Sequence, residues 1–178
     1  MAVAAASSSS ARAHIGCTTV ATLAQDWAER RPAQVAMRQK HHGVWREATW
    51  GEVWDEVMAA AHGLLALDVE VGDRVAIQSL DRTEWVVMDL AASAIRAVTV
   101  GLYPANPIAE VEYTLADCGP RVLVAEDQEQ VDKVLDGGVA GAALEKIIYI
   151  EDRGLARYSD ERLISWEAFL ELGRRHQA

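Results

Sequence analysis

The chain has 178 residues, of which 51% are apolar and 25% are charged. This composition is typical of a folded globular protein and excludes a chain that is disordered or fibrous throughout. Lys and Arg number 17 against 27 Asp and Glu, and the resulting net charge of −10 argues against binding nucleic acids or anionic lipids through bulk charge. Two cysteines cannot form a disulfide scaffold, so we expect a cytoplasmic protein. The most apolar stretch, residues 86–102, is interrupted by Asp89 and Arg96, so no transmembrane segment is predicted.

The N-terminal stretch differs in composition from the rest of the chain. Residues 1–18 contain no acidic side chain, a single arginine and a run of four serines. This pattern predicts a disordered leader, in which Cys17 is a free thiol of no special role. The folded domain is therefore expected over residues 19–178.

The first expected element is a short amphipathic helix over residues 23–31, with Thr22 as its N-cap and Pro32 as its stop. Three apolar side chains at helical spacing are expected to face the core, namely Leu23, Trp27 and Ala28. Two extended pieces follow at residues 35–39 and 44–48. The His-His-Gly sequence at 41–43 predicts a hairpin turn between them, with solvated histidines.

The clearest helix begins after Thr49. Apolar side chains recur every three or four residues from Trp50 to Leu65, which places them on one broad face. Thr49 and Glu52 have the spacing of a capping box, in which each side chain accepts from the other residue's amide. Because Trp50 and Trp54 share the face with Val and Leu, they are predicted to be core anchors and not a cofactor-stacking surface.

From residue 71 onward, strands and helices alternate regularly. Four near-continuous apolar runs begin 23, 24 and 25 residues apart, which is the length that a strand, a crossover helix and two loops require. Continuous apolar runs are typical of strands that are covered on both faces. The sequence therefore predicts an α/β fold with a doubly wound, mostly parallel sheet flanked by helices. The four predicted strands are residues 74–79, 97–102, 121–125 and 146–150.

Helix-start residues follow each of the first three strands of this region. Asp81 and Glu84 are predicted to cap the first crossover helix, and Asp127 the third. The second is expected to begin at Asn106 and Pro107, because proline suits the first helical position. Beyond residue 151 the chain becomes polar and charged, and one last amphipathic helix is expected over residues 165–173.

No catalytic, cofactor-binding or metal-ligating residue can be assigned from motifs. Neither of the two common glycine-rich phosphate motifs, G-x-G-x-x-G and G-x-x-x-x-G-K-[ST], occurs in the chain. The strand-end loops at 80–83, 103–107 and 126–127 lack the glycines that let a backbone approach a phosphate. The histidines have no partners at metal-binding spacing, and Cys118 lies on an apolar helical face, where a cysteine behaves as a small hydrophobic residue.

Several segments in order nevertheless resemble the N-terminal part of the long-chain fatty-acid–CoA ligases, a family of adenylate-forming, AMP-binding enzymes. Residues 71–89 (VGDRVAIQSLDRTEWVVMD) are similar to a family block written GDRVAI-S-NRPEW---D. Residues 91–107 (AASAIRAVTVGLYPANP) resemble the next block, A---GAV-VPIYPTNP. Shorter similarities at 22–32, 48–54, 122–133 and 164–173 extend the resemblance over about residues 20–173.

The resemblance implies an enzyme that activates a fatty acid with ATP and Mg²⁺ and then transfers the acyl group to CoA. The family's phosphate loop, its adenine and Mg²⁺ motif, its ribose-binding Asp and its catalytic Lys have no counterpart in these residues. We therefore expect a partial AMP-binding domain that ends before the phosphate loop, binds no cofactor itself and is inactive alone. Its expected partners are the missing remainder of the synthetase or a second copy. The alternative is a free-standing α/β interaction module that pairs with a separately encoded remainder.

Two positions depart from the family pattern. Arg96 stands where the family has the Gly of its GAV segment, and Gly101 stands where it has the first Pro of VPIYP. A glycine between a helix and a strand serves a close approach or a positive φ, so Arg96 is expected to be unfavourable there. Gly101 is expected to loosen a segment that proline makes rigid.

Overall fold

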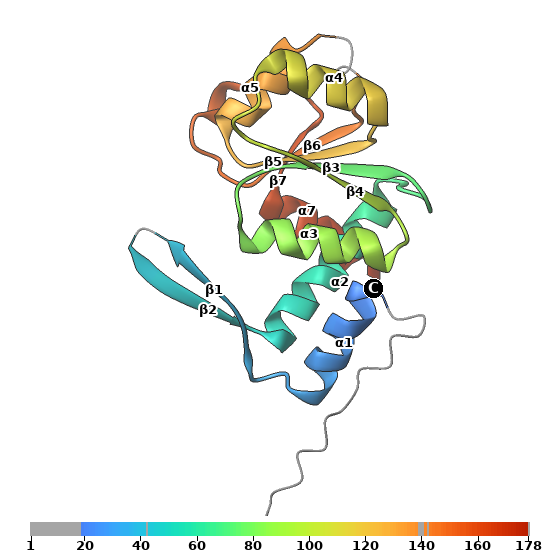
Figure 1. Cartoon of the computed structure of the whole chain (residues 1–178), viewed down its shortest axis with the longest axis vertical. Coiled ribbons are helices and arrows are strands. Elements are labelled where there is room, and N and C mark those ends of the chain that lie inside the picture. Colours follow the sequence, from blue (N-terminus) through green and yellow to red (C-terminus); the bar gives the residue numbers. More distant parts are fainter. Residues whose placement is uncertain (1–18, 42, 139–140, 142, 178) are drawn as a thin grey trace, which may run out of the picture.

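The computed structural model describes residues 19–41, 43–138, 141 and 143–177. Its centre is a five-stranded parallel sheet with the strand order β4-β3-β5-β6-β7 (Figure 1). The predicted α/β fold with a parallel sheet is thereby confirmed. The strands are β3 (Arg74–Gln78), β4 (Val98–Leu102), β5 (Val122–Ala125), β6 (Lys146–Tyr149) and β7 (Leu163–Ser165).

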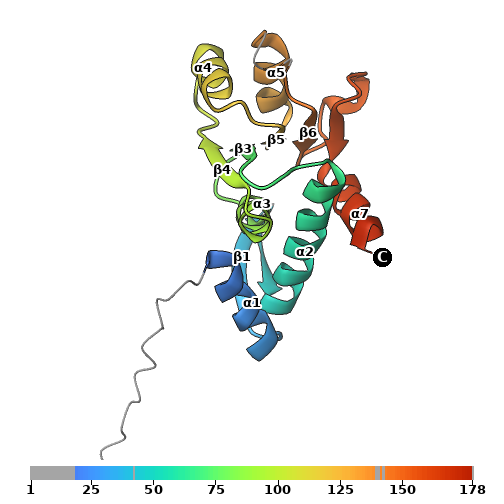
Figure 2. The same cartoon turned by 90° about the vertical axis from the view of Figure 1, so that its right-hand side faces the viewer.

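Helices cover both faces of this sheet, as a doubly wound fold requires. Figure 2 shows α4 and α5 on one side of the strands, with α2, α3 and α7 on the other. On the first side lie α4 (Ile108–Cys118) and α5 (Gln128–Asp136). The opposite side carries α1 (Val20–Arg30), α2 (Trp50–Ala66), α3 (Thr83–Ala94) and α7 (Trp166–Gln177). A single 3₁₀ turn, η1 (Leu155–Arg157), lies between β6 and β7.

The central strands are apolar throughout because each of their faces meets a different core. Val75 and Ile77 of β3 belong to the core under α2, α3 and α7, whereas Ala76 between them belongs to the core under α4 and α5. In β5, Val122 and Val124 alternate with Leu123 in the same way. All of these side chains are fully buried, which explains why the sequence shows continuous apolar runs and no alternation.

The predicted hairpin is formed by β1 (Val35–His41) and β2 (Val44–Thr49), and it projects away from the body of the protein (Figure 1). The strands are antiparallel, with His41 opposite Val44. Gly43 has a φ of 82°, which glycine adopts without steric cost in a tight turn. His41 is half-buried, whereas a solvated histidine was expected. His42 lies outside the described residues.

The capping box at the start of α2 is confirmed. The Thr49 amide donates to Glu52 Oε2 at 2.8 Å, and the Glu52 amide donates to Thr49 Oγ1 at 3.3 Å. Hydrogen bonds from the Thr49 backbone and side chain lower the pKa of the Glu52 carboxyl. Trp50 and Trp54 are half-buried and pack against the core, and Trp50 also stacks on Trp27 with ring centroids 5.8 Å apart.

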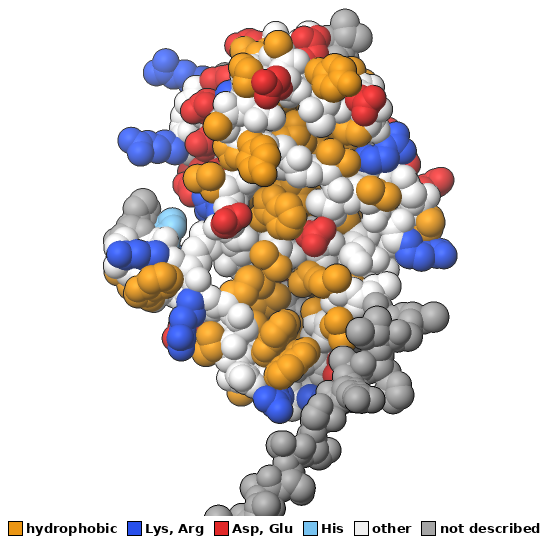
Figure 3. Space-filling view, viewed as in Figure 1, with side chains coloured by type: hydrophobic (Ala, Val, Ile, Leu, Met, Phe, Trp, Pro, Cys, Tyr) orange, Lys and Arg blue, Asp and Glu red, His pale blue; other side chains and the backbone are white. Residues whose placement is uncertain are grey.

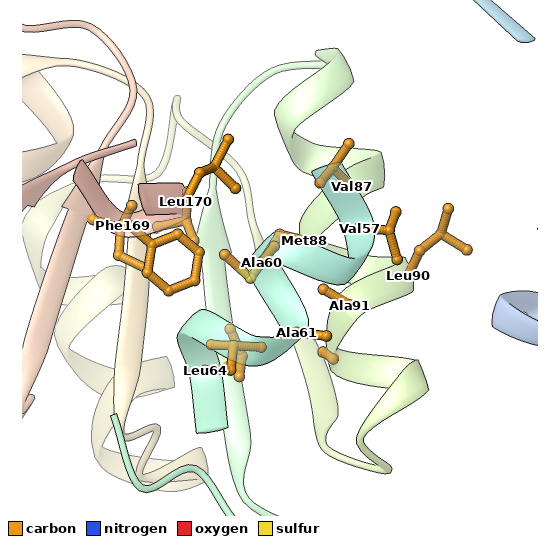
Figure 4. Close-up of a cluster of buried hydrophobic side chains, with 14 of the residues drawn as sticks. Val57, Ala60, Ala61, Leu64, Val87, Met88, Leu90, Ala91, Phe169 and Leu170 are labelled. Carbon is orange, nitrogen blue, oxygen red and sulfur yellow. The ribbon is translucent and has the colours of Figure 1, made fainter. Parts of the chain in front are cut away.

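Helices α2, α3 and α7 share the larger core (Figure 4). Phe169 of α7 lies against α2 at Gly63, where a Cβ atom would stand only 2.6 Å from the phenyl ring. Four residues further along α7, Gly173 lies against the backbone of α2, and a Cβ there would overlap the carbonyl oxygen of Ala59. The two glycines therefore allow the helix axes to approach closely.

The buried face of α1 differs from the prediction. The helix begins at Val20 with Thr19 as its N-cap, and the Thr22 amide donates to Thr19 Oγ1 at 3.2 Å. Its buried residues are the alanines at 21, 24 and 28. Leu23 and Trp27, which were expected to be buried, are 47% and 38% exposed. Small alanine side chains let α1 lie close to α2 and α3, and this rotation leaves the two larger side chains outside.

The C-terminal region contains a strand that the sequence analysis missed. Residues 163–165 form β7, which pairs in parallel with β6. Three residues within a charged segment are too few for a periodic pattern to appear, so the strand has no clear sequence signal. The helix that follows, α7, extends beyond the expected end at 173 and reaches Gln177.

Arg96 has a φ of 62° and is exposed in the turn between α3 and β4. Its carbonyl accepts from the Gly72 amide at 2.9 Å, and its amide donates to the Ser93 carbonyl at 3.1 Å, so neighbouring hydrogen bonds hold this conformation. Non-glycine residues pay a steric cost in the left-handed region. We therefore expect Arg96→Gly to raise the free energy of unfolding by roughly 0.5–1 kcal/mol in a urea melt.

Asp68, with a φ of 55°, provides the matched comparison for this prediction. Aspartate tolerates the left-handed region better than arginine does, so Asp68→Gly is expected to stabilise less than Arg96→Gly. A lower urea midpoint for Arg96→Gly than for the parent chain would contradict the interpretation of Arg96 as an unfavourable substitution.

Candidate functional site

The carboxyl ends of β3, β5 and β6 define the candidate site. Open parallel sheets bind ligands where two adjacent strands send their crossovers to opposite faces. β3 and β5 are adjacent, and they continue into α3 on one face and α5 on the other. The loops at this point are residues 79–82, 126–127 and 150–152.

Arg82 is the central side chain of this region, and its side chain is only 13% exposed. Its Nη1 atom donates to Glu151 Oε1 at 2.8 Å and lies 3.5 Å from Glu126 Oε1. Its Nε atom donates to Glu84 Oε2 at 3.2 Å. The backbone amide of Leu80 donates to the other oxygen of Glu126 at 2.6 Å. Arg82 and Glu126 thus connect the ends of β3, β5 and β6 across the point where a ligand would enter.

The charges of this cluster are unbalanced, because one guanidinium faces three carboxylates. Burial opposes the charged form of Arg82, but hydrogen bonds to Glu151 and Glu84 outweigh it, so the pKa of Arg82 is raised above its ordinary value. The cation is thus fully engaged by protein carboxylates. An ion-pair cluster of this kind stabilises the strand ends. Its excess negative charge repels phosphate groups, which agrees with the absence of phosphate-loop glycines from the loops at this edge.

A hollow of about 710 Å³ lies beside this cluster, between the hairpin, the start of α3, the end of β6 and α7. Its lining is rich in acids, including Glu56 and Glu167 besides Glu84 and Glu151. Burial, and then the nearby charge of Glu84, raise the pKa of the Glu56 carboxyl. Among the described residues, no group of three or more His, Cys, Asp or Glu side chains is arranged to hold a metal ion.

The start of α3 is held by the hairpin and not by the residues expected to cap it. The N-cap position is Arg82, which makes no side-chain capping bond, so the prediction of Asp81 and Glu84 as caps is wrong. Instead, the Thr83 amide and hydroxyl both donate to Gln39 Oε1 of β1, at 3.0 and 2.7 Å. This contact attaches the projecting hairpin to the carboxyl edge of the sheet.

The loops after β4 and β5 lead into α4 and α5 on the other side of the sheet. Asp127 caps α5 as predicted, accepting from the Gln130 amide at 3.3 Å. Lys133 donates to the Pro104 carbonyl at 2.5 Å, which ties the loop after β4 to α5. Cys118 is half-buried at the end of α4, and burial raises the pKa of its thiol, which disfavours the nucleophilic thiolate.

Sequence reasoning did not single out Arg82, although a signal for it exists. The loop after the first strand of the alternating region carries an arginine, and the loops after the third and fourth carry acids. In a parallel sheet these loops meet at one edge, so an ion-pair cluster could have been anticipated there.

Comparison with known proteins identifies the class to which this domain belongs. The profile of the family described as AMP-binding enzyme matches residues 24–167. The chain therefore belongs to the AMP-binding enzyme family.

Curated relatives of the chain include acyl-CoA ligases. The long-chain-fatty-acid–CoA ligase FadD15 of Mycobacterium bovis is 35% identical over 123 residues, which cover 69% of this chain and 20% of the relative. The long-chain-fatty-acid–CoA ligase ACSBG2 of Xenopus laevis is 25% identical over 156 residues, which cover 88% of this chain and 21% of the relative. The chain thus spans about a fifth of the length of these relatives.

Solved structures share the fold. The acetoacetyl-CoA synthetase from Streptomyces lividans superposes with a TM-score of 0.75 at 24% identity, covering 84% of this chain and 24% of the synthetase. The anthranilate CoA ligase AuaEII, in complex with anthranoyl-AMP, gives a TM-score of 0.72 at 24% identity, covering 85% of this chain and 26% of the ligase. In the described part of this chain, no helix combines the length and apolar character needed to cross a membrane.

Proposed function

We propose that this chain supplies the N-terminal α/β portion of a cytoplasmic long-chain fatty-acid–CoA ligase, and that it does not catalyse acyl-adenylate formation by itself. The family match over residues 24–167, in a chain that spans about 20% of its relatives, is the observation that carries this proposal. ATP, Mg²⁺ and CoA belong to the activity of the complete enzyme. Residues 19–178 form one partial AMP-binding domain in this view, and residues 1–18 precede it as a leader.

The acidic edge of the sheet supports the assignment of nucleotide binding to other parts of the enzyme. A transferring phosphoryl or adenylyl group needs donors and cations aimed at its oxygens. At the carboxyl edge of this sheet, the buried cation Arg82 is instead engaged by Glu84, Glu126 and Glu151. No residue of this chain is therefore proposed as catalytic, cofactor-binding or metal-ligating in the ligase reaction.

Fatty-acid-dependent exchange of pyrophosphate into ATP tests the proposal directly. The purified chain is expected to give no exchange above the blank with a long-chain fatty acid, ATP and Mg²⁺. Full-length FadD15, assayed under the same conditions, serves as the positive control. Exchange by the chain alone would overturn the proposal.

The same assay distinguishes the alternative of a module that pairs with a separately encoded remainder. The chain is mixed with a FadD15 fragment that lacks the 123-residue region similar to this chain. Exchange that appears only in the mixture would favour the pairing module, and its absence would favour a portion that acts only within one continuous polypeptide.

A further inference from the structure

The last turn of α7 brings a second histidine beside α2. Figure 2 shows the two helices side by side. The imidazole rings of His62 in α2 and His176 in α7 have their centroids 6.3 Å apart, and their planes are inclined at 51°. The two residues are far apart in the sequence, so their spacing along the chain gives no sign of the pair.

The close packing of α2 against α7 determines where these two histidines lie. Gly63, the neighbour of His62, faces the Phe169 ring. Gly173, three residues before His176, faces the backbone of α2. The buried core that the two helices share fixes the backbone at both histidines, so only their side chains need to move in order to bind a ligand.

Two facing imidazoles are suited to a divalent transition-metal ion. Imidazole nitrogen is a preferred ligand of Zn²⁺, Ni²⁺ and Cu²⁺, whereas Mg²⁺ prefers oxygen ligands. Zn–N bonds of about 2.1 Å place two imidazole rings about 5 Å apart, centre to centre, on one tetrahedral ion. The rings must therefore approach each other by about 1 Å, and side-chain rotation allows this because His62 is only half-buried and His176 is exposed.

The charges around the pair favour a cation on balance. The chain has a net charge of −10, and Figure 3 shows acidic side chains spread over the face that it displays. His176 lies in the last turn of α7, where the helix dipole favours positive charge. Arg174 and Arg175 in the same turn oppose a cation. A carboxylate oxygen of Glu171 lies 3.9 Å from each of these arginines and offsets part of their charge.

We propose that His62 and His176 bind a divalent transition-metal ion of the Zn²⁺ type, which links α7 to α2. Each imidazole supplies one nitrogen, and water completes the coordination, since no group of three or more His, Cys, Asp or Glu is arranged for a metal among the described residues. The bound ion holds the last turn of α7 on α2 and thereby stabilises the folded chain. The site takes no part in the ligase reaction proposed above, so the two proposals stand or fall separately.

Calorimetric titration with Zn²⁺ tests the site, in a Cys17→Ser/Cys118→Ser background that removes competing thiolates. We expect Zn²⁺ to bind and Mg²⁺ to give no comparable binding. His62→Gln and His176→Gln should each weaken the Zn²⁺ affinity by about tenfold or more, since the loss of a ligand costs at least as much as the loss of an outer partner. The double variant should bind no more weakly than either single variant, because both histidines hold one ion.

A relocated histidine is the matched control, because it keeps the composition of the chain. His176→Gln/Gln177→His moves the imidazole by one residue, about 100° around α7. This variant should therefore bind Zn²⁺ no better than His176→Gln does. His41→Gln/His42→Gln removes the adjacent histidines of the hairpin turn and should leave the affinity unchanged.

Urea melts give a second measurement that does not depend on calorimetry. Without metal, they establish that every variant is folded. Zn²⁺ should raise the urea midpoint of the parent chain and of the hairpin variant, and it should leave the midpoints of the His62 and His176 variants unchanged. A parent chain that binds no Zn²⁺, equal affinity in the parent and the relocated variant, or binding that is lost only in the hairpin variant would overturn the proposal.

Discussion

Gly173→Ala is expected to lower the free energy of unfolding by about 2–3 kcal/mol, because the added methyl group overlaps the backbone of α2. The nearest atoms to a Cβ at this position are the Ala59 carbonyl oxygen and the Gly63 nitrogen, the latter at 2.6 Å. Backbone atoms cannot move aside as a flexible side chain can, so α7 must shift away from α2. The better helix propensity of alanine, about 0.5–1 kcal/mol, offsets only part of this cost.

A urea melt of the purified chain measures the effect, and Gly101→Ala is the control for the same chemical change. Gly101 lies inside β4, and its φ is unstrained. It therefore does not loosen a loop, which differs from the expectation. A Cβ there meets only the Trp85 ring at 3.6 Å, an ordinary contact. This control is expected to stabilise by about 0.5 kcal/mol. If Gly173→Ala left the free energy of unfolding unchanged, α2 and α7 would not be as close as described.

Phe169 extends the test to the neighbouring glycine. At Gly63 the obstructing atoms belong mainly to the phenyl ring, at 2.6 and 2.8 Å. Phe169→Leu, which removes the ring, should therefore restore part of the stability lost in Gly63→Ala. A double-mutant cycle measures this effect. Gly173→Ala should gain nothing from Ala59→Gly, since the obstruction there is a carbonyl oxygen.

Arg82→Met is expected to cost about 2–3 kcal/mol at pH 7, since it leaves three carboxylates of the cluster without their cation. The estimate is below that for a fully buried pair because the Glu151 side chain is 40% exposed. Without Arg82, the carboxylates of Glu84, Glu126 and Glu151 repel one another in a partly buried site. Urea melts of the parent and the variant at pH 7 measure this loss of stability.

Arg38→Met is the matched control for the loss of an arginine ion pair. Arg38 Nε lies 2.7 Å from Glu47 Oε1, but the two side chains are 64% and 51% exposed. Exposed ion pairs contribute little to stability, so this variant is expected to change the free energy of unfolding by less than about 0.5 kcal/mol. Similar losses for both variants would contradict the assignment of Arg82 as the centre of a partly buried cluster.

The regular part of the fold could be predicted from sequence because several independent signals agree there. The runs containing Val75 and Val122 are apolar on both faces, and the Thr49–Glu52 pair marks a helix start within its own segment. The predictions fail where packing between segments distant in the sequence determines the structure. The burial of Ala24 in place of Trp27 depends on how α1 lies on α2 and α3, which no pattern within α1 encodes. The three residues of β7 are a strand only because β6 is beside them.

The candidate site was harder to predict for a related reason. Arg82, Glu126 and Glu151 come from three separate loops, and each is unremarkable in its own segment. Only the strand order, in which β5 lies between β3 and β6, brings them together. Sequence motifs detect residues that act within one loop, so a cluster assembled by topology gives no local signal.

The pairing of α2 with α7 also determines when the protein can fold during synthesis. Gly63 and Phe169 are far apart in the sequence, so the larger core closes only after α7 (Trp166–Gln177) has left the ribosome. Until then α2 and α3 expose the apolar surface that Phe169 and Leu170 cover in the finished domain. Contacts this distant make folding slow, and the nascent chain is exposed to aggregation in the meantime. Chaperone dependence of this domain in the cell is therefore expected to be set by the emergence of α7.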